Sequence, residues 1–249
     1  MSEILLFILA GFGAGVMNAI AGGGTFLTFP ALVFAGIPPV AANATSAVAV
    51  FPGYFAAALG FGDEIRELPR RNLVRATGAA LAGGLAGGIL LLVSSNDVFS
   101  AIVPFLLFAA TLAFAFQKQI SAWLATSGLQ LTSWGLPGIF VVSLYGGYFN
   151  GGLGIVLLAL FALWGMGSLN AMNGLKNALS LVISAISVAT FVVAGIVSWP
   201  AALIMGASAI AGGYAGARLA KILPVVLMRG AIIVIGLTMS AVFFARLFS

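Results

Sequence analysis

Six polar side chains in the second half of the chain follow one another at the spacing of a helix. The intervals between them are 3, 1, 3, 4 and 3 residues: Asn173, Lys176, Asn177, Ser180, Ser184 and Ser187. This spacing places all six on one face of a helix. A polar group surrounded by hydrocarbon is costly unless it is paired, so we expect this face to line a bundle interior or a hydrated path. For the three serines, helix–helix packing is the leading alternative.

Lys176 is the residue of this face with the strongest chemistry. We predict a helix over residues 173–195, which puts the lysine in the first turn, where the positive end of the helix dipole disfavours a cation. No Asp or Glu lies inside any of the apolar segments given below. An external anion is therefore the natural partner, because helix N-termini already form anion sites. The alternative is that the side chain of Lys176 extends to the membrane surface.

Two asparagines, Asn43 and Asn173, open predicted helices at corresponding places in the two halves of the chain. Asn is a preferred N-cap residue, because its side-chain oxygen accepts a hydrogen bond from a free backbone N–H. Capping and contact with a ligand are compatible, so both interpretations stay open. Thr45 and Ser46 follow Asn43 within one helical turn and complete a shorter polar motif in the first half.

Glycine-rich stretches interrupt the apolar sequence at two places, NAIAGGGTFLTFP in the first half and NGGLGIVLLAL in the second. Glycine lets a chain turn and expose its N–H groups inside protein rather than lipid. We therefore expect Gly22, Gly23 and Gly24 to break a helix, with Thr25 near the start of the next one. The alternative is a close helix-packing contact. A third stretch, ALAGGLAGG, is expected to serve helix packing.

The first two glycine-rich stretches belong to an internal repeat with an offset of 130 residues. The matched pairs are Gly22 with Gly152, Gly24 with Gly154, Asn43 with Asn173, Ser46 with Lys176 and, after a gap of two residues, Asn18 with Asn150. We divide the chain into a first repeat at 1–116, a cytoplasmic linker at 117–135 and a second repeat at 136–249. Each repeat holds five apolar segments, so the repeats would insert in opposite directions, as in many secondary transporters.

The composition indicates an integral membrane protein. The chain has 249 residues, of which 62% are hydrophobic and 6% are charged, and its mean hydropathy is +1.22. Its apolar runs are continuous, which favours helices over a β-barrel. We predict one all-α membrane domain, a helical bundle of 8–10 segments at residues 4–21, 25–36, 43–61, 73–93, 98–116, 136–153, 154–166, 173–195, 199–219 and 225–247. The segments 25–36 and 154–166 are too short to span a bilayer, which takes about 20 residues.

Basic residues collect in three loops, at residues 62–72, 117–133 and 220–224. Cytoplasmic loops carry an excess of Lys and Arg, so we place these loops in the cytoplasm and both termini in the periplasm. The basic residues are explained by topology, and we expect no binding to nucleic acid despite a pI near 10.1.

The chain contains neither His nor Cys. Their absence removes the commonest general base, thiol nucleophiles and the usual transition-metal ligands. A retinal Schiff base at Lys176 would need a carboxylate counter-ion, and the segments hold none. We therefore expect neither an enzyme nor a bound cofactor or metal.

The sequence resembles the sulfite exporter TauE/SafE family, also called the toluene-sulfonate uptake permease family. The resemblance rests on GFGAGVMNAIAGGGTFLTFPAL and GIPPVAANATSAVAV in the first half and on the weaker copies NGGLGIVLLAL and NGLKNALS in the second. It implies a bacterial multi-pass carrier of sulfur-containing anions such as sulfite and sulfonates. The second copy has GGLG where the first has GGG and Lys176 where the first has Ser46, so we expect the two halves to contribute unequally.

We expect a secondary transporter of the bacterial inner membrane that moves a small anion by alternating access. Export is favoured, because an anion that moves outward follows the inside-negative potential. A passive channel and a carrier of a different organic anion remain alternatives. The coupling ion and the oligomeric state stay open. The candidate substrate-binding residues are Gly22, Gly23, Gly24, Thr25, Asn43, Thr45, Ser46, Gly152, Gly154, Asn173, Lys176 and Asn177, and the candidates for a gate or supporting contacts are Asn18, Tyr148, Asn150 and Ser180.

Overall fold

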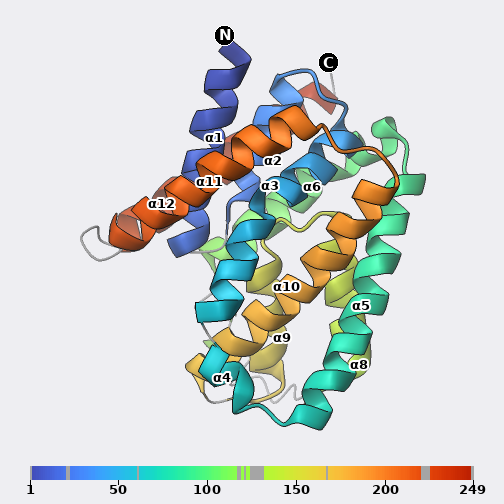
Figure 1. The fold of residues 1–249 in the computed structure, drawn as a ribbon, viewed down its shortest axis with the longest axis vertical. Helices are drawn as coiled ribbons and strands as arrows, with labels where there is room; N and C mark the ends of the chain where they lie inside the picture. Colours follow the sequence, from blue (N-terminus) through green and yellow to red (C-terminus); the bar gives the residue numbers. More distant parts are fainter. Residues whose placement is uncertain are drawn as a thin grey trace.

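The chain folds as a bundle of α-helices in a computed structural model that describes residues 2–20, 23–60, 62–116, 119–120, 122–123, 132–166, 168–219 and 225–247. The described residues contain no strand, so the all-α prediction is confirmed. Each of the ten predicted segments corresponds to a helix, whereas the short helix α4 lies where the sequence predicts a loop. The helices are α1 (Ser2–Ile20), α2 (Thr25–Phe34), α3 (Pro39–Gly60), α4 (Gly62–Arg66), α5 (Arg70–Val93), α6 (Asn96–Ala115), α8 (Leu136–Tyr148), α9 (Leu153–Leu163), α10 (Leu169–Val193), α11 (Trp199–Leu219) and α12 (Val225–Leu247), as Figure 1 shows.

Two of these helices, α2 and α9, are too short to cross a bilayer, as predicted. α2 has 10 residues and α9 has 11. At about 1.5 Å per residue each helix is roughly 15–17 Å long, about half the thickness of a hydrocarbon core of about 30 Å. Each short helix begins a few residues after another helix has ended, so the chain breaks twice. The first break lies between α1 and α2, and the second lies between α8 and α9.

Three helices of the described residues are long and apolar enough to cross a membrane, by length and composition. They cover Arg70–Val93, Asn96–Ala115 and Ala171–Val193. The third of these ranges contains all six residues of the polar face that the sequence analysis singled out, Lys176 among them. Together with the composition, these helices identify an integral membrane protein.

Glycines let helices from opposite halves of the chain pack backbone against backbone. α1 packs along α11, and α5 packs along α8. In the first pair, a Cβ built on Gly11 would lie 2.8 Å from the Cα of Met205. In the second pair, a Cβ built on Gly87 would lie 2.8 Å from the backbone nitrogen of Tyr148. Side-chain carbons are not accommodated at such distances, so the packing role predicted for ALAGGLAGG is confirmed.

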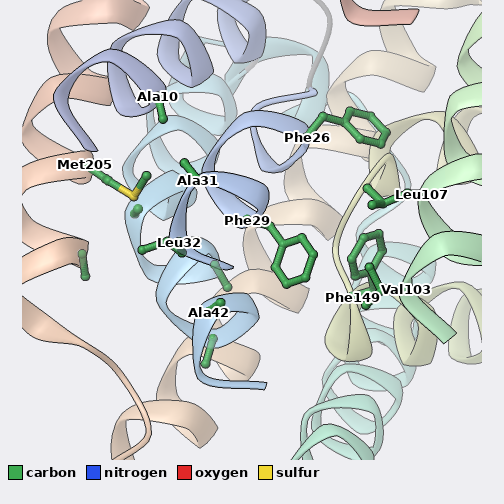
Figure 2. Packing of buried hydrophobic residues seen from close by; sticks show 14 of the residues in the cluster. Ala10, Phe26, Phe29, Ala31, Leu32, Ala42, Val103, Leu107, Phe149 and Met205 are labelled. Carbon is green, nitrogen blue, oxygen red and sulfur yellow. The ribbon is translucent and has the colours of Figure 1, made fainter. Parts of the chain in front are cut away.

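An aromatic cluster holds α2 in the bundle. The ring of Phe29 packs edge-on against Phe99 and Phe149, with ring centroids 6.1 and 5.9 Å apart, and stacks on Phe243 at 5.6 Å. Figure 2 shows Phe29 directed toward Phe149, with Leu107 beside them. α2 is buried among these rings, and Gly23 and Gly24 are buried just before it, so the described part of the first break lies inside protein and not in lipid.

A second apolar cluster lies between α5, α8, α9 and α10, which gather in the lower part of Figure 1. Leu153, Leu157 and Phe161 contribute the buried side of α9, and Leu175 and Leu179 contribute that of α10. This cluster fixes α9 against α10, the helix that carries Lys176. The two long helices that carry the polar motifs, α3 and α10, pack against each other between the two clusters.

Candidate functional site

The first break is closed by a side chain from the end of α1. The backbone N–H of Gly24 donates to Oδ1 of Asn18 at 2.8 Å. A Cβ on Gly24 would lie 2.7 Å from Nδ2 of Asn18 and 2.9 Å from the carbonyl oxygen of Ala14. Gly24 therefore makes the close packing contact that was the alternative explanation for these glycines. Thr25 begins α2, as predicted, and Gly22 lies outside the described residues.

A buried pair of hydroxyl groups joins α2 to α3. Oγ1 of Thr28 lies 2.6 Å from Oγ of Ser46, and it also lies 3.3 Å from the carbonyl oxygen of Gly24. Both side chains are fully buried. The sequence analysis proposed Ser46 but missed Thr28, although Thr28 lies one helical turn after Thr25 and its position on the same face was a usable signal.

The polar motif of α3 is divided between two structural tasks. Nδ2 of Asn43 donates to the carbonyl oxygen of Tyr148 at 2.9 Å, which brings α3 to the second break. Oγ1 of Thr45 accepts the backbone N–H of Ser198 at 3.0 Å, at the start of α11. Thr45 thus joins α3 to the start of α11.

The second break contains two residues with left-handed backbone conformations. Asn150 has φ 63° and Gly152 has φ 71°. Oδ1 of Asn150 accepts the hydroxyl of Tyr54 at 3.3 Å, and Nδ2 of Asn150 donates to Oγ of Ser184 at 3.4 Å. The hydroxyl of Tyr145 donates to the carbonyl oxygen of Gly151. Tyr54 is a site residue that sequence reasoning missed.

Tyr148, a predicted gate residue, is buried where α8 ends. Its hydroxyl lies 3.4 Å from Oγ of Ser94, and its ring packs edge-on against Phe99 with centroids 5.5 Å apart. These contacts hold the side chain of Tyr148 between α5 and α6, and its backbone carbonyl faces Asn43.

Lys176 lies beside the second break. A Cβ on Gly154 would be 3.3 Å from Cδ of Lys176, so the aliphatic part of the lysine crosses the first turn of α9. Nζ donates to Oδ1 of Asn173 at 3.3 Å. The ion pair formed among the described residues joins exposed Arg66 and Asp63, so Lys176 has no acidic partner in that part of the chain. The lysine and the second glycine-rich stretch, both of which hold candidate site residues, are therefore in contact.

Several hydrogen-bond donors near Lys176 are unused within the described residues. The backbone N–H groups of Gly152 and Gly154 have no acceptor there. Asn177 is 6% exposed, and Oγ of Ser180 is buried without a hydrogen-bond partner among the described residues. Ammonium, amide and hydroxyl groups of this kind suit an anion that carries several oxygens.

The two helices that carry the polar motifs, α3 and α10, begin earlier than the sequence predicts. α3 begins at Pro39 and α10 at Leu169, each four residues earlier than predicted. Asn43 and Asn173 therefore lie inside helices, and the N-capping interpretation is wrong for both. Ser168 caps α10 instead, because its Oγ accepts the N–H of Ala171 at 3.3 Å. Lys176 lies about two turns inside α10 and not in its first turn. The dipole of its own helix is therefore not a reason to expect an anion beside it.

Ser184 and Ser187 lie on the same polar face of α10, but one contacts the second break and the other bonds within its own helix. Oγ of Ser187 donates to the carbonyl oxygen of Ile183 at 2.8 Å, within α10. This bond is the ordinary way in which a serine in a buried helix is satisfied, and it supports the packing interpretation for Ser187. Ser184, by contrast, accepts from Asn150 and belongs to the second break.

The chain is similar over nearly its whole length to known membrane proteins. The sequence profile of the sulfite exporter TauE/SafE family matches residues 7–243. A probable membrane transporter protein, ORF9, of a Sinorhizobium species is 30% identical over 220 residues, which cover 88% of this chain and 84% of that protein. A probable membrane transporter protein of Haemophilus influenzae is 27% identical over 239 residues, covering 96% and 93%, and YfcA of Escherichia coli K12 is 28% identical over 245 residues, covering 92% and 84%.

No solved structure matches the chain. The match of the family profile extends from α1 to α12 and includes both breaks, the polar motif of α3 and the polar face of α10. The resemblance stated from the glycine-rich motifs is thereby confirmed. The chain belongs to the sulfite exporter TauE/SafE family, a family of membrane transporters.

Proposed function

We propose that this protein is a secondary transporter that exports a small sulfur-containing anion, such as sulfite or a sulfonate, across the bacterial inner membrane. The observation that carries the proposal is the position of Lys176. Its side chain is partly buried in an apolar helix, lies against Gly154 at the second break, and has no acidic partner among the described residues. A buried cation without a counter-charge is costly, and a bound anion relieves that cost.

The donors around Lys176 fit an oxyanion better than a neutral solute. Each oxygen of a sulfite or sulfonate group accepts hydrogen bonds, and the site offers N–H groups of Gly152 and Gly154 together with the side chain of Asn177. Charge-assisted hydrogen bonds are about twice as strong as neutral ones. In this proposal Lys176 supplies the charge, Asn173 orients its ammonium group, and the break supplies the amides.

The pairing of the helices supports alternating access by two inverted repeats. α1 of the first half packs on α11 of the second, and the corresponding helix of the second half, α8, packs on α5 of the first. The matched long helices α3 and α10 pack on each other. These exchanged pairs fit a two-fold relation between residues 1–116 and 136–249, and on that basis we propose that the substrate binds between the two breaks.

The acidic residues favour movement of the anion without a coupled proton. The chain has five Asp and Glu residues, and four of them are exposed in the structure: Glu3, Asp63, Glu67 and Asp97. Glu64, on the short helix α4, is partly buried. Glu3 and Asp97 lie in the first turns of α1 and α6, so none of the five lies in the middle of a span, as a proton relay would. An inside-negative potential of 100 mV drives an anion outward with about 2.3 kcal/mol, which suffices for export.

This energetic proposal is tested by measuring flux in vesicles of fixed membrane potential. We expect a protonophore, added with the potential clamped, and removal of Na⁺ to leave the rate unchanged, and we expect the rate to rise with the potential. A rate that follows the proton or Na⁺ gradient at constant potential would exclude uniport.

The membrane orientation follows from the basic residues near α4 and α5. Arg66, Arg70 and Arg71 are exposed there, and the positive-inside rule places them in the cytoplasm, with both termini in the periplasm. Reporter domains fused after residue 67 and after residue 95 should report the cytoplasm and the periplasm, respectively. The opposite pattern would invert the proposed topology.

The transport proposal itself is tested at Lys176 in proteoliposomes loaded with radiolabelled sulfite. Lys176→Ala and Lys176→Met should reduce sulfite efflux at least about tenfold, because loss of a charged hydrogen-bonding partner costs a buried ligand about 1.5–3 kcal/mol. Lys176→Arg keeps the charge and should retain part of the flux. Arg71→Ala removes an exposed charge and serves as the control, with unchanged flux expected. Undiminished efflux in Lys176→Ala contradicts the proposal.

A passive anion channel is the second candidate, and the lack of a carboxylate in the middle of the spans is the observation that favours it. A carrier should show saturable counterflow, in which unlabelled sulfite on one side accelerates movement of the label from the other. A channel should show unitary currents in planar bilayers. Currents without counterflow would replace the carrier by the channel.

A further inference from the structure

Side chains of α3 hold the second break, which belongs to the other half of the chain, at two points. Nδ2 of Asn43 donates to the carbonyl oxygen of Tyr148 at 2.9 Å, and the hydroxyl of Tyr54 donates to Oδ1 of Asn150 at 3.3 Å. These partners are 105 and 96 residues apart in the sequence. The two bonds lie on either side of Phe149, so α3 is hydrogen-bonded to the break at its start, Tyr148, and at its centre, Asn150.

The matching side chains of α10 do not make the reciprocal contact with the first break. At the offset of 130, Asn43 matches Asn173 and Tyr54 matches Ser184. Oδ1 of Asn173 accepts from Lys176, and Oγ of Ser184 accepts from Asn150. Side chains at all four related positions are therefore directed to the second break or to Lys176.

The first break is held from within its own half. Its side-chain hydrogen bonds in the described residues run from Gly24 to Asn18, from Thr28 to Gly24, and between Thr28 and Ser46. The two breaks thus resemble each other in sequence but differ in what supports them. Among the described residues, the side-chain hydrogen bonds of the first break stay within the first half of the chain, whereas two of those at the second break come from α3.

Asn150 is the residue on which this support converges. It is 4% exposed and has φ 63°, a left-handed conformation that is uncommon for residues other than glycine but better tolerated by Asn. Such conformations persist where the surroundings fix them. Tyr54 occupies the oxygen of its amide and Ser184 occupies the nitrogen, so both ends of the side chain are fixed.

We propose that Asn43 and Tyr54 are positioning residues through which α3 sets the conformation of the second break. The backbone that follows Asn150 carries the free N–H groups of Gly152 and Gly154, and Lys176 lies across Gly154. Loss of the Tyr54 contact frees the turn at Asn150 and misaligns these donors with the ammonium group. The second half of the chain then selects the anion, and the first half keeps the selecting groups in place. The consequence for transport rests on the proposed function, whereas the structural part does not.

Hydrogen–deuterium exchange tests the structural part without any substrate. Tyr54→Phe removes the hydroxyl and keeps the ring. We expect amide exchange in residues 149–154 to accelerate about tenfold, as loss of one hydrogen bond allows, while exchange in residues 23–28 stays the same. Thr190→Val is the matched control, because Oγ1 of Thr190 bonds the carbonyl of Ile186 within α10. Unchanged exchange in residues 149–154 of Tyr54→Phe overturns the proposal.

Sulfite efflux from proteoliposomes tests the consequence for binding. KM for sulfite should rise about tenfold in Tyr54→Phe with a smaller change in kcat, because the donors are misaligned but present. Thr190→Val should match the wild type in both. A faster exchange with an unchanged KM would overturn the role in anion selection. If the wild type does not move sulfite, the proposed function fails, and the exchange measurement still decides whether α3 positions the break.

Discussion

The aliphatic chain of Lys176 rests on the backbone of Gly154. A Cβ built on the glycine would lie 3.3, 3.8 and 4.0 Å from Cδ, Cγ and Cε of the lysine. The glycine is the first-turn residue of a helix too short to span the membrane, and the lysine is the cation of a helix long enough to do so. The contact therefore couples the position of the charge to the position of the break.

Gly154→Ala should weaken substrate binding more than it weakens the fold. The added methyl group meets the flexible part of Lys176 at 3.3 Å, so the lysine has to shift by a few tenths of an ångström. We expect KM for sulfite to rise by about three- to tenfold, because small misplacements of a binding group are costly. Gly78→Ala, whose methyl group meets nothing within 4 Å, is the control. Equal KM values in both variants would contradict the role of this contact.

Gly87→Ala should destabilise the protein, because its methyl group would lie 2.8 Å from the backbone nitrogen of Tyr148. Forcing extra carbon into a packed interface costs about 1–3 kcal/mol. Gly78→Ala lies on the same helix in open space and should be neutral or stabilising by up to about 1 kcal/mol. Thermal unfolding of the purified variants in detergent gives the comparison. A Gly87→Ala variant as stable as Gly78→Ala would show that α5 and α8 are not in close contact.

The hydroxyl pair of Thr28 and Ser46 predicts a non-additive result. Thr28→Val leaves the buried Oγ of Ser46 without its partner at 2.6 Å and should cost about 1–3 kcal/mol. The double variant Thr28→Val/Ser46→Ala removes both polar groups and should recover part of that loss. Unfolding measurements on the two single variants and the double variant complete the cycle. Strictly additive losses would mean that the two hydroxyls do not interact.

Ser168 and Asn173 distinguish the observed start of α10 from the predicted one. Ser168→Ala removes the N-cap and should cost about 1 kcal/mol of stability. Asn173→Ala should cost less stability, because Asn173 lies inside the helix, and should instead impair sulfite transport by releasing Lys176. Thermal unfolding shows which of the two variants loses more stability. A larger loss in Asn173→Ala than in Ser168→Ala would indicate that Asn173 is the N-cap of α10.

Features that depend on local composition could be predicted from the sequence. Runs of apolar residues set the helices, and two glycine-rich stretches set the short helices that follow them, so ten segments and both breaks were predictable. The proximity of Lys176 to Gly154 was also predictable, because an internal repeat relates Ser46 to Lys176 and Gly24 to Gly154. In the first half Ser46 of α3 contacts Thr28 near the start of α2, and in the second half Lys176 of α10 contacts Gly154 near the start of α9.

Features that depend on contacts between distant segments could not be predicted. Asn43 and Asn173 were interpreted as N-caps because each is a polar residue that precedes an apolar run. The structure shows that one further helical turn precedes each of them, and the sequence did not indicate that turn. Tyr54 looked like an ordinary aromatic residue of a membrane helix. Its partner Asn150 is 96 residues away, and no local pattern indicates that pairing.

The packing of α1 against α11 has a consequence for biogenesis. The residues between Ile20 and Trp199 must be synthesised before α1 can meet its glycine-matched partner. Until α11 has been synthesised, the glycine-containing face of α1 is in contact with lipid or with the insertion machinery instead of with α11. Contacts between such distant segments form slowly and leave surfaces open to wrong pairings. The glycines that let α1 pack closely on α11 therefore also make assembly of the first half dependent on a helix of the second half.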